Sequence, residues 1–191
     1  KNENIYILLL TGFGMMVFWA FSQPLLPLYS KEVLNIGGGG YAILNGLYFF
    51  GSMLGSLLIT FSVVKIRKSR ILFISALFFS FFHILLYNSN EPLISGFLIV
   101  ASGISHSIWW ISILVYLQTI SDEKYKGRVV GFYFSLLVSV SVGSILGGLI
   151  SEFIGTRSTV YLAMACLMAI HSFAFMSPKL RKLNLLEKTS Y

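Results

Sequence analysis

Long stretches without a charged residue constrain this chain more than any other feature of its sequence. Asp, Glu, Lys and Arg are absent from six segments, at residues 4–30, 33–64, 71–90, 92–121, 129–151 and 158–178. Each segment holds the roughly 20 residues that a helix needs to cross a bilayer. The 191 residues are 56% hydrophobic and 11% charged, whereas soluble domains carry about 25% charged residues. A domain of this size cannot bury so much apolar surface, so the sequence predicts a protein embedded in lipid.

The six segments predict an all-α membrane protein with six transmembrane helices in a single domain over residues 1–191. The expected spans are residues 5–29, 41–64, 71–89, 93–119, 129–151 and 158–177. The first segment lacks a small-residue cleavage site, so we count it as a span rather than a removable signal peptide. The second segment opens with Gly37, Gly38, Gly39 and Gly40, which is loop composition, so its helix is expected to start near Tyr41.

The cations are distributed unevenly between the two sides that alternating spans would create. One side holds only Lys31 and Arg157 of the 14 Lys and Arg residues, and the other side holds the remaining twelve. Cytoplasmic loops are enriched in Lys and Arg, so the richer side is predicted to be the cytoplasm, with both termini on it and the chain in the inner (plasma) membrane. The net charge of +7 then reflects topology. A nucleic-acid-binding protein would gather its cations on a hydrophilic face, so we expect no nucleic-acid partner.

No acidic residue lies well inside a predicted span. The seven are Glu3, Glu32, Glu91, Asp122, Glu123, Glu152 and Glu187. An intramembrane enzyme would need a polar catalytic set within its spans, such as paired His and Glu, so catalysis is not expected. The single cysteine, Cys166, lies in an apolar run, which excludes an internal disulfide and offers no metal-ligand spacing. We expect neither a metal nor a cofactor.

Small residues recur at four-residue intervals in two spans. This spacing lays a smooth ridge along a helix, on which another backbone can pack closely. The residues are Gly51 and Gly55 in the second span, and Gly131, Ser135, Ser139, Gly143 and Gly147 in the fifth. They indicate helix packing or, as a functional alternative, helices that slide past a partner during a conformational cycle.

Two segments resemble the major facilitator superfamily, and the likeness extends over nearly the whole chain. The first is "PLLPLYSKEVLNIGGGGYAILNGLYFFGSMLGSLL", and the second is "SDEKYKGRVVGFYFSLLVSVSVGSILGGLISEFIG", with Gly127 and Arg128 at a cytoplasmic helix start. The loop "TFSVVKIRKSRIL" keeps Lys65, Arg67, Lys68 and Arg70 but lacks the acid and glycine typical of the amino-terminal half. With the tail "SPKLRKLNLLEK", it resembles the carboxy-terminal half of exporters related to macrolide efflux proteins and the enterobactin exporter.

This resemblance implies six helices arranged as two inverted three-helix repeats, and secondary active efflux of a small amphipathic molecule by alternating access. Full transporters of this kind carry two six-helix halves around a cavity, so a second half is an expected partner. Either the chain is part of a longer polypeptide, which we favour, or two copies assemble about a two-fold axis. The alternatives are a non-transporting membrane scaffold or assembly factor and, less favoured, an intramembrane enzyme.

The resemblance also implies that the first and fourth helices line the substrate cavity. The candidate residues in these spans are Met16, Trp19, Ser22, Gln23, Ser102, His106, Trp109 and Trp110. Aromatic rings supply apolar contact area while Gln and His fix orientation, which suits a bulky amphipathic solute. His83 and His171 are expected to pack against lipid or neighbouring helices. Pro24 and Pro27 are expected to bend or end the first helix.

Overall fold

The computed structural model describes residues 2–61 and 68–177, and every regular element within them is a helix. Six spans in this part are long and apolar enough to cross a bilayer, which confirms the predicted fold class. Four spans are single helices: α3 (Gly37–Phe61), α4 (Lys68–Asn88), α5 (Pro92–Ile120) and α8 (Thr156–Met176). The first span joins α1 (Asn2–Phe21), α2 (Leu25–Leu28) and the π-helix η1 (Tyr29–Val33). The fifth joins the short 3₁₀ helix η2 (Glu123–Tyr125), α6 (Lys126–Ser135) and α7 (Val138–Ile154).

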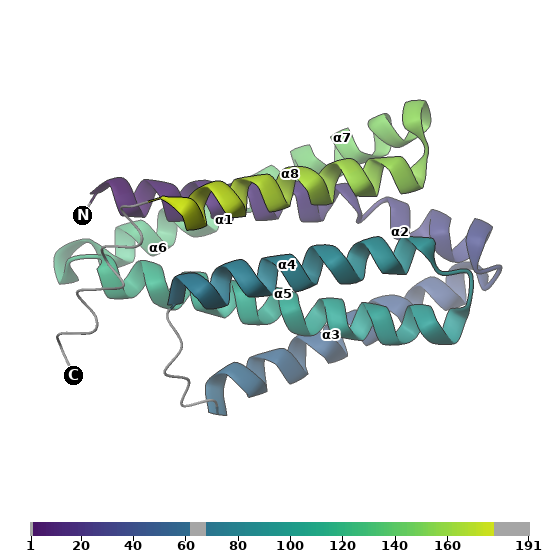
Figure 1. Cartoon of the computed structure of the whole chain (residues 1–191), viewed down its shortest axis with the longest axis horizontal. Helices are drawn as coiled ribbons and strands as arrows, with labels where there is room; N and C mark the ends of the chain where they lie inside the picture. Colours follow the sequence, from purple (N-terminus) through teal and green to yellow (C-terminus); the bar gives the residue numbers. More distant parts are fainter. Residues whose placement is uncertain (1, 62–67, 178–191) are drawn as a thin grey trace.

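The helices pack as two equivalent groups of three spans. In Figure 1, α4 and α8 run side by side, α5 packs on α3 and α4, and α1 packs on α7 and α8. If the first three spans are matched in order with the last three, α1 corresponds to α5, α3 to α7 and α4 to α8. The contact of α3 with α5 then matches that of α7 with α1, and the contact of α4 with α5 matches that of α8 with α1. This is the contact pattern of two three-helix repeats related by a pseudo-two-fold axis.

Glycines make close helix contacts between the two repeats. Gly51 and Gly55 of α3 lie against the backbone of Val100 and Ile104, while Gly143 and Gly147 of α7 lie against the backbone of Val17 and Phe21. In both contacts, two glycines four residues apart meet two backbone positions four residues apart. A side chain at any of the four glycines would meet backbone atoms, so these helix pairs approach as closely as small-residue packing permits.

The small-residue ridge expected along the fifth span is divided. Ser139, Gly143 and Gly147 are buried, but Gly131 and Ser135 are exposed, and nothing lies within 4 Å of a Cβ added at Gly131. The helix breaks between Ser135 and Val138, where backbone bonds reach only three residues back. The Ser135 and Ser139 hydroxyls donate to the Phe132 and Leu136 carbonyls at 2.7 and 2.6 Å, which tightens this turn and rotates α6 relative to α7.

The first span is interrupted at residues 22–24, as its prolines predict. Pro24 has no N–H to donate, so the regular helical bonding ends there. The chain continues through α2 and then through η1, a wider π turn, which leads into the turn before α3. The interruption lies against α4 and α7, whose side chains take up its carbonyls, as described below.

The prediction that the second helix starts near Tyr41 is wrong, because α3 begins four residues earlier, at Gly37. Gly37 supplies the turn with a φ of 61°, which a residue with a side chain rarely adopts. Gly40 then donates to the Ile36 carbonyl at 3.1 Å and is buried against the Ile36 side chain. These local contacts hold the glycine-rich segment in a helix despite its low intrinsic propensity.

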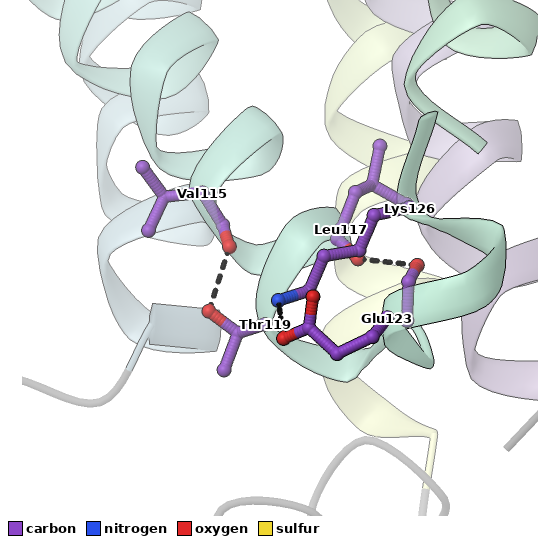
Figure 2. Close-up of polar contacts among 6 residues, drawn as sticks. Val115, Leu117, Thr119, Glu123 and Lys126 are labelled. Atoms are coloured by element: carbon purple, nitrogen blue, oxygen red, sulfur yellow. Dashed lines mark hydrogen bonds and ion pairs between the residues drawn. The ribbon is translucent and has the colours of Figure 1, made fainter. Parts of the chain in front are cut away.

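Both described chain ends lie at one end of the bundle, which we call the terminal end (Figure 1). Figure 2 shows the α5–α6 connection there. Thr119 donates to the Val115 carbonyl at 2.8 Å, and Lys126 pairs with Glu123 at 2.5 Å. Arg128 and the neighbouring Gly127 are exposed, and the Arg128 guanidinium lies 5.8 Å from the centre of the Tyr125 ring. The contacts of Glu123, Tyr125, Lys126 and Arg128 are thus local to this cationic connection.

The other cationic loop expected at the terminal end falls largely outside the described residues. Lys65 and Arg67 lie in the segment that is not described, and the structure describes the backbone but not the side chain of Lys68. Arg70 is exposed near the start of α4.

Candidate functional site

The predicted cavity residues separate into an outer and an inner layer. Trp19, Gln23, His106 and Trp110 are half-buried. Met16, Ser22, Ser102 and Trp109 are buried, with at most 2% of each residue exposed. The outer four therefore form the part of the predicted set that a solute could touch in this conformation.

The outer layer is an aromatic surface that joins α1 to α5. The Trp19 and His106 rings are stacked, with centroids 5.3 Å apart and planes inclined by 18°. Tyr48 of α3 adds a third ring 5.9 Å from His106, and Trp110 adds a fourth at 6.1 Å. Offset and tilted ring pairs at these separations are favourable contacts. We call these four residues the aromatic surface.

His106 keeps its hydrogen-bonding capacity. Among the described residues, its ring makes contacts with other rings and no hydrogen bond. An imidazole in this state can still donate through one nitrogen and accept through the other. His106 therefore supplies one polar group of the aromatic surface, beside the Trp19 indole N–H and the Tyr48 hydroxyl.

A buried hydrogen-bond chain lies directly behind this surface and is centred on His83 of α4. Ser102 lies 2.6 Å from His83 Nδ1, and Ser22 lies 3.3 Å from His83 Nε2. His83 therefore links two residues that were predicted as cavity residues on two different helices. Phe79, one turn earlier on α4, separates the two histidines, with ring centroids 4.3 Å from His83 and 5.5 Å from His106.

The direction of this chain can be assigned from its partners. The single Ser22 hydroxyl proton is donated to the Trp19 carbonyl at 2.7 Å, so Ser22 Oγ accepts from His83 Nε2–H. Nδ1 of a neutral ring is then the acceptor for the Ser102 hydroxyl. The chain thus runs from α5 through α4 to the Trp19 carbonyl of α1, with His83 as the neutral Nε2–H tautomer.

Side chains from other spans add hydrogen bonds to carbonyls at the break in the first span, which also accept backbone N–H groups. Tyr87 of α4 donates to the Ser22 carbonyl at 3.0 Å, and Ser144 of α7 donates to the Ala20 carbonyl at 3.3 Å. Beyond the break, the Tyr29 hydroxyl is 2.6 Å from the Leu86 carbonyl and 2.7 Å from Ser95 Oγ. In hydrocarbon an unpaired backbone group costs several kcal/mol, so these side-chain bonds and the backbone bonds together stabilise the break within the span.

Trp109 departs from the sequence expectation. Its side chain is fully buried, and its indole N–H donates to His171 Nε2 at 2.9 Å. His171 Nδ1 in turn lies 2.9 Å from the Leu167 carbonyl, to which it donates. Trp109 therefore ties α5 to α8 inside the bundle, while its neighbour Trp110 is on the aromatic surface. His171 is a packing residue, as predicted.

Sequence reasoning missed His83, Tyr48 and Asn45. Asn45 and Tyr48 lie one turn apart on α3 and line a small pocket together with Ser22, Gln23 and His83. The sequence does contain a signal for His83. Phe79, His83 and Tyr87 recur at four-residue intervals, so their side chains share one face of α4. No group of three His, Cys, Asp or Glu residues in the described chain is placed to hold a metal ion.

The fold and this site define a class, a polytopic helical membrane protein built from an inverted repeat with a polar and aromatic centre. Comparison with known families matches residues 8–188 to the Major Facilitator Superfamily. The chain belongs to this superfamily and is a membrane transporter protein. No curated protein matches the chain.

Proposed function

We propose that the chain is one six-helix half of a secondary transporter that moves a small amphipathic molecule by alternating access. The observation that carries this proposal is the aromatic surface, where the half-buried rings of Trp19 and His106 stack. Rings with unused hydrogen-bonding groups are suited to a solute that is partly apolar and partly polar. A second half, from the same polypeptide or from a second copy, would close the cavity over this surface.

The charge distribution supports an uncharged or weakly charged solute. None of Trp19, Gln23, Tyr48, His106 and Trp110 is an acid or a Lys or Arg, and the acids of the described spans lie near the span ends. Desolvating an ion against such a surface is costly without a partner charge. The preferred substrate is thus an aromatic amphiphile without a strong fixed charge.

The close glycine contacts support movement of helix pairs as units. The pairs α3 with α5 and α1 with α7 are held by backbone contact at Gly51, Gly55, Gly143 and Gly147. Packing this tight resists sliding within a pair, because cores rearrange between discrete arrangements rather than deforming continuously. Rocking of this half against its partner would then expose the aromatic surface to each side of the membrane in turn.

The proposed transport direction, membrane orientation and location are supported by sequence features. Arg70, Lys124, Lys126 and Arg128 lie at the terminal end, whereas Lys31 and Arg157 lie at the opposite end. This asymmetry favours a cytoplasmic terminal end in the plasma membrane. The resemblance to exporters favours efflux and the carboxy-terminal half of such a protein. We also propose that residues 1–191 form a single six-helix domain.

A liposome assay tests this function. The native polypeptide is reconstituted into vesicles loaded with 4-methylumbelliferyl glucoside, an uncharged aromatic amphiphile, and downhill release of this dye is followed by fluorescence. Trp19→Ala and His106→Ala are expected to raise the KM for release roughly two- to ten-fold, because each removes a ring contact. The matched control is Phe81→Ala, which truncates an exposed ring on α4 away from the aromatic surface.

The outcomes separate transport from a scaffold role. Protein-dependent release that weakens in the two site variants and not in Phe81→Ala supports transport over the aromatic surface. Release of the uncharged dye that never exceeds the release from vesicles without protein favours the scaffold and contradicts the proposal. Equal weakening in all three variants would mean that the aromatic surface is not the path.

A further inference from the structure

We propose that the pocket between the break in the first span, α2, α3, α4 and α5 binds a neutral carboxamide or hydroxyl group of the transported molecule. This inference rests on the proposed function and deepens it, because it assigns the polar part of the substrate to a particular place. The aromatic part would lie on the adjoining aromatic surface.

The pocket is small and is lined by both polar and apolar side chains. Its polar lining consists of Ser22, Gln23, Asn45, Tyr48, His83 and Tyr87, and its apolar lining consists of Leu26, Leu86 and Ile99. Its volume is about 20 Å³. A cavity needs about 10–15 Å³ on this measure to hold a single water, so the pocket accepts a small polar group and not a whole solute.

Three of the lining residues have polar groups without a protein partner. The Tyr48 hydroxyl is buried, makes no hydrogen bond, and belongs to a residue that is 7% exposed. Within the described residues, the side-chain amides of Gln23 and Asn45 also make no hydrogen bond, and both residues are half-buried. Buried polar groups are nearly always satisfied in native structures. An unpartnered hydroxyl beside two unpartnered amides therefore indicates a place for a ligand group.

The remaining polar atoms of the pocket are already committed. His83 uses both ring nitrogens in the chain between Ser22 and Ser102, and Tyr87 donates to the Ser22 carbonyl. What the pocket can offer is one hydroxyl and two carboxamides, each of which both donates and accepts. The complementary ligand must likewise donate and accept.

A charged group would not suit this pocket. Its nine lining residues include no Asp, Glu, Lys or Arg, and the assigned tautomer makes His83 neutral. An ion transferred here would lose its hydration without gaining an opposite charge, which is far more costly than transferring a neutral amide. Carboxamides and hydroxyls are therefore favoured over carboxylates and amidinium groups.

Tyr48 connects the pocket to the aromatic surface. Its hydroxyl belongs to the pocket lining, while its ring lies 5.9 Å from the His106 ring. The Trp19 side chain interacts with the Tyr48 hydroxyl, and the buried Trp19 indole N–H likewise has no partner at hydrogen-bond geometry. A ligand with a polar group in the pocket would thus have its ring beside Trp19 and His106. An aromatic carboxamide is the simplest molecule with this shape.

Three molecules of nearly equal size test the proposal. Benzamide carries a neutral carboxamide, benzoate an anion and benzamidine a cation on the same ring. Each is titrated against the full native polypeptide in lipid nanodiscs, and binding is measured by saturation-transfer NMR. Benzamide is expected to bind more tightly than both charged molecules.

Two matched variants locate the binding. Tyr48→Phe removes the unpartnered hydroxyl and is expected to weaken benzamide binding roughly two- to twelve-fold, the equivalent of one hydrogen bond. Tyr133→Phe is the control, because Tyr133 also has a buried hydroxyl without a partner but does not line the pocket. Its benzamide affinity is expected to equal that of the parent protein.

The inference is overturned if benzamide does not bind, if benzoate or benzamidine binds equally well, or if Tyr48→Phe and Tyr133→Phe have the same effect. These failures are distinct from failure of the proposed function. Dye release that depends on Trp19 and His106 without benzamide selectivity retains the transporter and removes the neutral pocket. Selective benzamide binding without dye release retains the pocket and removes the transport proposal.

Discussion

Adding one methyl group to each of two adjacent glycines in α7 is predicted to have opposite effects on stability. A Cβ at Gly147 would lie closer than 3.0 Å to three backbone atoms of Phe21, whereas a Cβ at Gly148 would have nothing within 4 Å. Replacement of a helical glycine by alanine gains about 0.5–1 kcal/mol from the reduced backbone entropy of the unfolded chain. Gly148→Ala is therefore expected to stabilise the protein by about that amount.

Gly147→Ala receives the same gain but also forces α1 and α7 apart. The atoms in the way belong to the backbone and cannot rotate aside, so a typical overpacking cost of about 1–3 kcal/mol applies. Since the propensity gain is common to both variants, it cancels in the comparison. The unfolding free energy of Gly147→Ala should thus be lower than that of Gly148→Ala by about 1–3 kcal/mol.

Equilibrium unfolding by SDS in mixed micelles, followed by circular dichroism, measures this difference. A second pair on the expected ridge, Gly143→Ala against Gly131→Ala, should show the same contrast, because Gly143 is buried against α1 and Gly131 is open. A difference below about 0.5 kcal/mol within both pairs, the size of a neutral surface substitution, would refute the described contact between α1 and α7.

Three further predictions concern the buried polar contacts and use the same unfolding measurement. His83→Leu should lower the unfolding free energy by about 1–3 kcal/mol, since the buried Ser102 hydroxyl loses its acceptor and Ser22 loses a donor; an unchanged value would contradict the assigned chain. Trp109→Phe should cost about 1 kcal/mol through loss of its bond to His171, and a double-mutant cycle with His171→Phe should show coupling of similar size; additive effects would mean that the bond is absent. Tyr29→Phe should destabilise by about 1–3 kcal/mol, whereas Tyr161→Phe, whose hydroxyl bonds an exposed Asn88, should stay within about 0.5 kcal/mol; equal effects would contradict the burial assigned to Tyr29.

The six spans could be predicted from the sequence because each reflects the average hydropathy of about 20 residues, which tolerates local exceptions. Helix boundaries depend on single residues and were harder to predict. The early start of α3 depends on the turn at Gly37, and the division between α6 and α7 depends on two serine hydroxyls that tighten one turn. Neither effect changes the hydropathy of the span.

The candidate site was partly predictable. Trp19 and His106 stand out in sequence because they are aromatic or polar residues far from the ends of their spans. Trp109 and Trp110 could not be separated in this way, since adjacent residues differ by about 100° around a helix and the sequence does not say which direction faces α8. The role of His83 depends on the approach of α1 and α5 to α4, and such a convergence of three helices has no local sequence signal.

The central claim is that the aromatic surface faces a water-filled path. A side chain that the helices leave uncovered can contact either water or lipid, so the most direct test is to distinguish the two. A single cysteine is placed at Gln23 or at Phe81 after replacement of the native cysteine by Cys166→Ala, and each protein is treated in membranes with a membrane-impermeant maleimide. Maleimides react with the thiolate, which forms in water and not in hydrocarbon. The account predicts labelling of Gln23→Cys and not of Phe81→Cys, which lies on the exposed face of α4. Absence of labelling at Gln23→Cys, or equal labelling at both positions, would contradict a water-filled transport path over this surface.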